Sequence, residues 1–98
     1  MMLQVLGELR GPLALIERHD KDLGNQLRRA ASSVALNLAE GSGSGGTRLA
    51  RYRTALGSAR ETGACLDVAI ALGYVDGVDA ALLGRLDRVR AMLAGLVR

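Results

Sequence analysis

The longest pattern of hydrophobic positions in the chain covers residues 47–72. Apolar and small residues recur there with a period of 3.5 residues, which is typical of one long helix packed lengthwise on others. Its two seven-residue rows are Leu49, Leu56, Gly63 and Ile70, and beside them Tyr52, Ala59, Leu66 and Gly73. A second stripe flanks these rows and consists of Ala55, Thr62, Cys65, Ala69 and Leu72. Because both stripes need cover, the pattern predicts a helix that has partners on more than one face.

Three further amphipathic patterns predict helices over residues 2–18, 21–41 and 77–97. Pro12 lies within the first pattern, and proline lacks the backbone N–H that a helix interior needs. Pro12 therefore either kinks this helix or opens a second short segment, and the unbroken apolar spacing favours the kink. Together with the helix over residues 47–72, the patterns predict an all-α fold, an antiparallel up-down-up-down four-helix bundle.

Charged residues and a glycine mark the predicted helix ends. Asp20 or Asp22 is expected to cap the second helix, because a carboxylate oxygen accepts hydrogen bonds from the free N–H groups of a first turn. Asp76 or Asp79 is expected to do the same for the last helix. Gly73 is expected to end the long helix, since glycine adopts the left-handed conformation at little cost.

The composition fits one domain, residues 1–98, with an aliphatic core: 49% of the residues are hydrophobic, but only two are Tyr and none is Phe or Trp. No run of 18 apolar residues occurs, and the N-terminus lacks the pattern of a signal peptide, so we expect neither a membrane span nor a leader. The single cysteine, Cys65, cannot form an internal disulfide, which favours a cytoplasmic location.

The net charge of +3 comes from arginine, since the chain has twelve Arg and one Lys. Guanidinium groups bind phosphates and carboxylates with two parallel hydrogen bonds. The first half of the long helix carries Arg48, Arg51, Arg53 and Arg60 and no acid, and Arg28 and Arg29 add further positive charge. We interpret Arg48, Arg51, Arg53, Arg28 and Arg29 as candidate nucleic-acid-binding residues that contact the phosphate backbone. The alternative is a solvated helical face.

Two other groups of residues are candidates for structural roles. Asn37, Glu40, Arg60 and Glu61 form a polar group in which Glu40 or Glu61 is expected to pair with an arginine across a helix or subunit contact; an acid/base pair is the less favoured alternative. Gly57, Ser58, Ala59 and Gly63 are all small, which predicts close approach of a neighbouring helix. Substitution of Gly63 by leucine is therefore expected to disrupt packing or assembly.

No arrangement of residues indicates catalysis, a metal or a cofactor. The glycines at positions 41, 43 and 46 match the dinucleotide-binding spacing, but that motif follows a strand, whereas a helix is predicted here. His19 is the only histidine and Cys65 has no histidine near it in sequence, so neither a metal site nor a Cys–His pair can be assembled. The sequence therefore predicts a protein that is not an enzyme.

Several of these residues also carry a resemblance to a known family. The matching segments are Gln26–Ala30, Ser33, Asn37–Gly41, Ala55–Ala59, Glu61 and Leu72–Tyr74. They resemble the four helix bundle protein family, also called the 23S rRNA intervening-sequence protein family, from about Leu3 to Leu96. The resemblance implies a homopentameric ring of small antiparallel bundles. It also implies kinship with the accessory variability protein of diversity-generating retroelements, which binds a reverse transcriptase and nucleic acid.

Pattern and resemblance together favour a non-enzymatic, homo-oligomeric scaffold or adaptor that binds structured RNA or DNA through arginine, alongside a protein partner. The alternative is a structural or protein-interaction module that uses its arginines for salt bridges and binds no nucleic acid. The two readings differ in one respect: the first needs arginines without carboxylate partners on one exposed surface.

Overall fold

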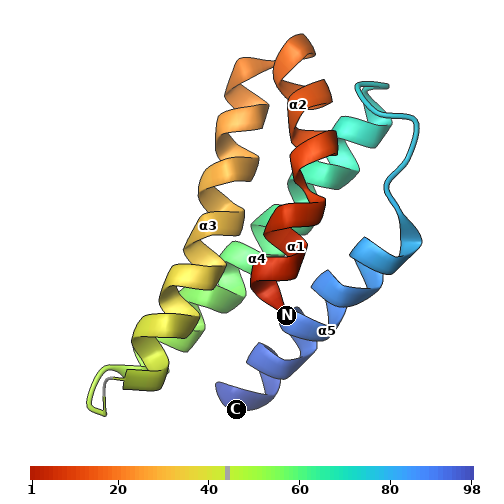
Figure 1. The fold of residues 1–98 in the computed structure, drawn as a ribbon. Coiled ribbons are helices and arrows are strands. Elements are labelled where there is room, and N and C mark those ends of the chain that lie inside the picture. Colours follow the sequence, from red (N-terminus) through yellow and green to blue (C-terminus); the bar gives the residue numbers. More distant parts are fainter. Residues whose placement is uncertain (44) are drawn as a thin grey trace.

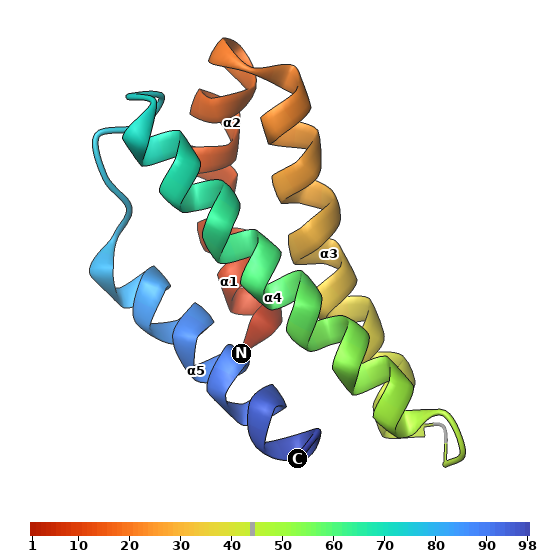
Figure 2. The ribbon, with the colours of Figure 1, turned by 180° about the vertical axis from the view of Figure 1, so that it is seen from behind.

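The computed structural model describes residues 1–43 and 45–98, and these residues form an all-α fold without β-strands. Its five helices are α1 (Met2–Glu8), α2 (Arg10–His19), α3 (Lys21–Gly43), α4 (Arg48–Ala71) and α5 (Ala80–Leu96) (Figure 1). The long helices α3 and α4 lie side by side and antiparallel (Figures 1 and 2). Helix α2 packs on α3, and α5 packs on α4 and α1. The prediction of an all-α fold is confirmed.

The helix predicted over residues 2–18 is divided into α1 and α2, so the expected disturbance by Pro12 is present. The interruption falls at Leu9, three residues before Pro12. Leu9 keeps right-handed helical angles, and hydrogen bonds from its N–H to the Val5 carbonyl and from Leu13 to its own carbonyl continue on both sides. Pro12 has no N–H to donate to the carbonyl of Glu8, and this missing bond explains why the helix is interrupted there.

The other helices differ from the prediction by one to three residues at some of their ends. Helix α3 continues to Gly43 instead of ending at Gly41, and α4 ends at Ala71. Helix α5 begins at Ala80 instead of residue 77, because Asp79 is its N-cap and accepts a hydrogen bond from Ala81 N–H at 3.1 Å.

The remaining caps follow the sequence. Asp20 caps α3 by accepting a hydrogen bond from Leu23 N–H at 3.0 Å. Gly73 has a φ of 78° and ends α4, with hydrogen bonds from Tyr74 N–H to Ala69 and from Gly73 N–H to Ile70. These are the two bonds of a Schellman motif, and they satisfy the last carbonyl groups of the helix.

The core is aliphatic and receives side chains from every helix. On α4 the fully buried positions include Ala55, Thr62, Leu66 and Ala69, each 0% exposed. The ends of the predicted rows are open, however: Leu49, Ile70 and Leu72 are 44%, 36% and 58% exposed. Figure 2 shows the beginning of α4 and the end of α3 projecting away from α1 and α5, so that fewer helices cover this part of the hairpin.

An ion pair between Glu8 and Arg85 joins α1 to α5. Arg85 donates from Nε to Glu8 Oε1 at 2.7 Å, and its Nη2 contacts the second carboxylate oxygen. The hydrogen bonds that Arg85 donates to Glu8 raise the pKa of the Arg85 guanidinium. This two-bonded geometry fixes the orientation of α5 against α1 more firmly than a single contact would.

Gly41 is a tightly packed glycine in this fold. A Cβ at position 41 would lie 2.5 Å from Cε1 of Tyr52, so the aromatic ring rests on the glycine backbone.

We predict that Gly41→Ala lowers the free energy of unfolding by about 1–3 kcal/mol, because the ring must move. Gly84→Ala in α5 is the control: a Cβ there meets nothing within 4 Å. It should raise stability by about 0.5–1 kcal/mol. Equal effects in urea denaturation would contradict this account.

Candidate nucleic-acid interface

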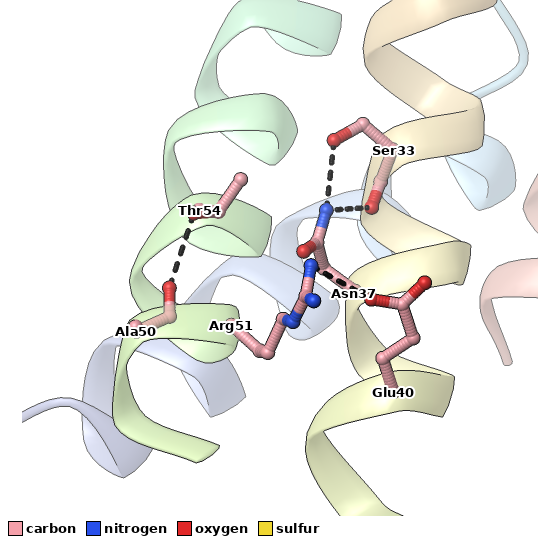
Figure 3. A network of polar contacts seen from close by, with 6 residues as sticks. All are labelled: Ser33, Asn37, Glu40, Ala50, Arg51 and Thr54. Atoms are coloured by element: carbon pink, nitrogen blue, oxygen red, sulfur yellow. Dashed lines mark hydrogen bonds and ion pairs between the residues drawn. The ribbon is translucent and has the colours of Figure 1, made fainter. Parts of the chain in front are cut away.

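A line of hydroxyl and amide groups joins α3 to α4. Ser58 on α4 donates to the hydroxyl oxygen of Ser33 on α3 at 2.8 Å. Asn37 Nδ2 donates to the carbonyl and hydroxyl oxygens of the same serine, at 2.9 and 3.0 Å (Figure 3). The fully buried Thr62 donates to the Ser58 carbonyl at 2.8 Å. The Ser58–Ser33 bond crosses between the helices and fixes their alignment at this point, whereas the Asn37–Ser33 and Thr62–Ser58 bonds lie within α3 and within α4 and orient the polar side chains beside it.

One turn beyond Asn37, this register places Glu40 opposite Arg51. Glu40 Oε2 lies 2.7 Å from Arg51 Nη1, and Figure 3 shows the guanidinium reaching from α4 to α3. The two side chains are 52% and 47% exposed. The hypothesised pairing of Glu40 with an arginine across a helix contact is therefore present, within one chain. Glu61 is exposed and forms no ion pair with a described residue.

Glu40 and Arg51 line an open groove of about 450 Å³ on the outer side of the hairpin. Most of the residues around this groove are polar or charged, and three of them are arginines. The lining residues are Arg28, Arg29, Ser32, Ser33, Leu36, Asn37, Glu40 and Arg51. The structure thus brings together three of the five arginines that the sequence indicated. It places them with Asn37, which the sequence assigned to a different group.

The arginines of this groove differ in their contacts. Arg28 contacts Glu17 on α2 and also donates to Asn25 Oδ1 at 3.3 Å. Arg29 forms no hydrogen bond or ion pair with any residue in the described part of the chain. A phosphate that enters the groove therefore meets one guanidinium without a protein partner and one, on Arg51, whose partner is exposed to solvent.

The other two candidate arginines, Arg48 and Arg53, are not among the residues that line this groove. Arg53 lies about 140° around the helix from Arg48, because five residues are well beyond one turn. Arg48 and Arg53 form no ion pair with a described residue. Arg60 lines a separate groove of about 320 Å³ between α4 and α5, with Ala59, Gly63, Ala64, Asp67, Leu83, Leu86, Asp87 and Arg90. The polar group of Asn37, Glu40, Arg60 and Glu61 is consequently divided between different surfaces.

The prediction of close helix packing holds for part of the small-residue group. Ala59 is 2% exposed, and Ser58 contacts α3 through its hydrogen bond. A Cβ at Gly57 or Gly63 would meet nothing within 4 Å, so neither glycine is required by a neighbouring helix of the same chain. The prediction was wrong for these two positions within one chain, because α4 turns them toward solvent and toward the open groove beside α5.

Sequence reasoning missed the two glycines that do allow close contact, Gly24 and Gly41. A Cβ at Gly24 would lie 2.5 Å from Cγ of Glu17, which keeps the partner of Arg28 close to α3. Both glycines are in phase with the buried stripe of α3, at the spacing 24, 27, 31, 34, 38 and 41. That phase was the available signal, because a glycine on a buried stripe marks a place where another element approaches the backbone.

Cys65 and His19, the two side chains considered for catalysis, have surroundings that favour a structural role. Cys65 is buried, and this burial, together with the charge of Glu61, raises the pKa of its thiol, which disfavours the nucleophilic thiolate. His19 is exposed and stacks on Tyr74, with ring centroids 5.3 Å apart, and Tyr74 donates to Asp20 Oδ2 at 3.4 Å.

The described residues contain no group of three or more His, Cys, Asp or Glu side chains able to hold a metal ion. The first two glycines of the motif, Gly41 and Gly43, lie inside helix α3 and no strand precedes them in the described residues; position 44 lies outside those residues. No helix in residues 1–43 or 45–98 has the length and apolar character needed to cross a membrane.

Comparison with known proteins adds a family to this geometry. A family model described as 23S rRNA-intervening sequence protein matches residues 13–95, which include α3, α4 and the groove between them. No curated protein and no solved structure matches the chain.

Proposed function

Since the chain belongs to the 23S rRNA-intervening sequence protein family, we propose that it is a non-enzymatic, homo-oligomeric scaffold or adaptor that binds structured nucleic acid. The observation that carries this proposal is the groove on the α3–α4 hairpin, where Arg28, Arg29 and Arg51 surround a space that, among the described residues, is lined by one carboxylate, that of Glu40. Guanidinium groups pair well with phosphate oxygens, and each phosphate contact releases counterions from the nucleic acid. Binding through this groove is therefore strong at low salt and weak at high salt.

The expected mode of binding is contact with the backbone, since the two tyrosines are already engaged. Tyr52 packs on Gly41, and Tyr74 stacks on His19 and bonds to Asp20. Stacking of unpaired bases on aromatic side chains is the usual way to hold a single strand. Without such a platform, the protein recognises the arrangement of phosphates on a folded or double-stranded nucleic acid.

Self-association completes the proposal. The α1–α2 segment acts as one arm and, with α3, α4 and α5, makes an up-down-up-down four-helix bundle, and copies of this bundle form a ring. Two features support the ring: large apolar side chains lie exposed on the hairpin, and Gly57 and Gly63 leave room for a neighbouring subunit. The exposed apolar residues of α3 and α4 are Leu36, Leu49, Val68 and Ile70. The family resemblance suggests five subunits, working in the cytoplasm.

The second candidate is a protein-interaction module that binds no nucleic acid. Its support is that several arginines do have carboxylate partners in the described chain: Arg28 with Glu17, Arg51 with Glu40, Arg85 with Glu8 and Arg90 with Asp87. On this account the exposed apolar side chains hold a partner protein. The two candidates differ in whether Arg29, which has no such partner, contributes to binding.

We predict that Arg29→Ala weakens binding of a labelled RNA hairpin at low salt by about 3–10-fold, as expected for one lost phosphate contact. Arg53→Ala removes the same charge from a different side of α4 and is the matched control, with a smaller effect. Fluorescence anisotropy at several salt concentrations measures both. Equal losses in the two variants would show that the groove has no special role, and absence of salt-sensitive binding by the unaltered protein would reject the proposal.

Assembly is tested separately by Gly63→Leu. A single chain has room for this side chain, so the variant should keep its helical circular dichroism, whereas a subunit seated at this position would be displaced. Light scattering is expected to show a loss of native mass toward the 10.3 kDa of one chain. Gly84→Leu on α5 is the control. An unaltered native mass for Gly63→Leu would contradict a subunit contact at this position.

A further inference from the structure

We propose that the α3–α4 groove is the phosphate-binding site of this surface and that Glu40 determines its selectivity, by competing with phosphate for Arg51. The inference rests on the proposed nucleic-acid function and goes further, because it assigns the ligand to one groove and gives its single carboxylate a role. On this account Arg51 is paired with Glu40 when the groove is empty, and a nucleic-acid backbone replaces the carboxylate with a phosphate when it binds.

The geometry of the pair makes this competition possible. Glu40 Oε2 and Arg51 Nη1 are 2.7 Å apart, and both side chains line the groove while about half of each is exposed. A ligand in the groove therefore reaches the guanidinium from solvent without unfolding anything. Ion pairs with this exposure contribute only about 0–1 kcal/mol, so a ligand with several phosphates can replace the carboxylate.

Hydrogen bonds near Glu40 keep its carboxylate, which competes with the ligand, close to Arg51. Asn37 lies three residues before Glu40 and is tied to Ser33, and Ser33 is tied across the helix contact to Ser58. Because the Ser33–Ser58 bond joins α3 to α4, Glu40 stays opposite Arg51 whether or not the groove is occupied. The carboxylate thus remains close enough to recover the guanidinium when the ligand leaves.

The other polar groups in the groove define what can displace Glu40. Arg28 and Arg51 each contact a carboxylate, but Glu17, the partner of Arg28, does not line the groove. Within the groove a ligand therefore competes with Glu40 for Arg51 and meets Arg29 without a described partner. Ser32 also lines the groove, and its hydroxyl forms no hydrogen bond with a described residue, so it can donate to a phosphate oxygen. Inorganic phosphate gains too few contacts to compete with Glu40. A backbone that presents successive phosphates to Arg29 and Arg51 gains several at once.

The test compares Glu40→Gln with Glu61→Gln, because both substitutions remove one negative charge from the same hairpin and only the first changes the groove. The probe is a fluorescein-labelled RNA hairpin at low salt. We expect Glu40→Gln to tighten binding about 3–10-fold relative to Glu61→Gln, since Arg51 no longer has an internal partner. In the absence of the hairpin, inorganic phosphate should also bind Glu40→Gln at lower concentrations than it binds the unaltered protein.

A second pair of variants separates competition for Arg51 from general repulsion. In an Arg51→Ala background, the gain from Glu40→Gln should disappear, because no guanidinium is left for the carboxylate to occupy. A gain that persists there, or equal gains in Glu40→Gln and Glu61→Gln, would overturn the role of Glu40. Circular dichroism checks that each variant is folded.

The remaining outcomes concern the ligand class. If an acidic peptide of matched charge binds as tightly as the hairpin, the groove is not selective for a phosphate backbone and the inference fails. If no variant binds the hairpin at any salt concentration, the proposed function and this inference both fail. If the unaltered protein binds but Glu40→Gln gives no specific gain, the proposed function survives and only the inference is rejected.

Discussion

The register of α3 against α4 is the constraint on which the rest of this structure depends. Ser58 on α4 bonds to Ser33 on α3, and the ring of Tyr52 on α4 rests on the backbone of Gly41 at the end of the same helix contact. Apolar side chains alone would tolerate small shifts along the helix axis, whereas hydrogen bonds lose most of their energy when they are misaligned. The hairpin is thus aligned by polar contacts and stabilised by the aliphatic core beside them.

The placement of charge follows from this alignment. Glu40 meets Arg51 because the register puts the turn after Asn37 opposite the first turns of α4, and Arg28 and Arg29 reach the same groove from one helical turn before Ser32 and Ser33. Arg53 and Arg60 are close to Arg51 in sequence but lie on other sides of α4. The mild net charge of the chain is therefore less informative than its distribution, since one groove collects three arginines against a single carboxylate.

The parts of this picture that the sequence predicted are those that depend on local periodicity. The buried stripe of α3, the long helix α4, the Asp caps and the glycine at the end of α4 all follow from side-chain spacing and backbone preferences, and they were anticipated. The break between α1 and α2 was anticipated from Pro12, which removes a backbone donor, but its position at Leu9 was not, because the apolar spacing continues through it. Helix α3 extends past Gly41 because a tertiary contact with Tyr52 makes a glycine useful inside the helix, and no local rule contains that contact.

The sequence identified most residues of the candidate site, but it did not predict which of them lie together. Arg28, Arg29, Arg51, Asn37 and Glu40 were all singled out, but the sequence divided them between two sets, since which residues share a groove depends on the relative rotation of two helices. The same rotation leaves Gly57 and Gly63 without a neighbour in the chain, where the sequence had suggested close packing.

The most direct measurement of the central claim is an NMR titration of the ¹⁵N-labelled protein with an unlabelled RNA hairpin at low salt. The account predicts that the largest amide shifts occur at Arg29, Ser32, Ser33, Asn37 and Arg51, and that added salt reverses them. Shifts confined to the neighbourhood of Arg53 and Arg60, or no shifts at all, would contradict it.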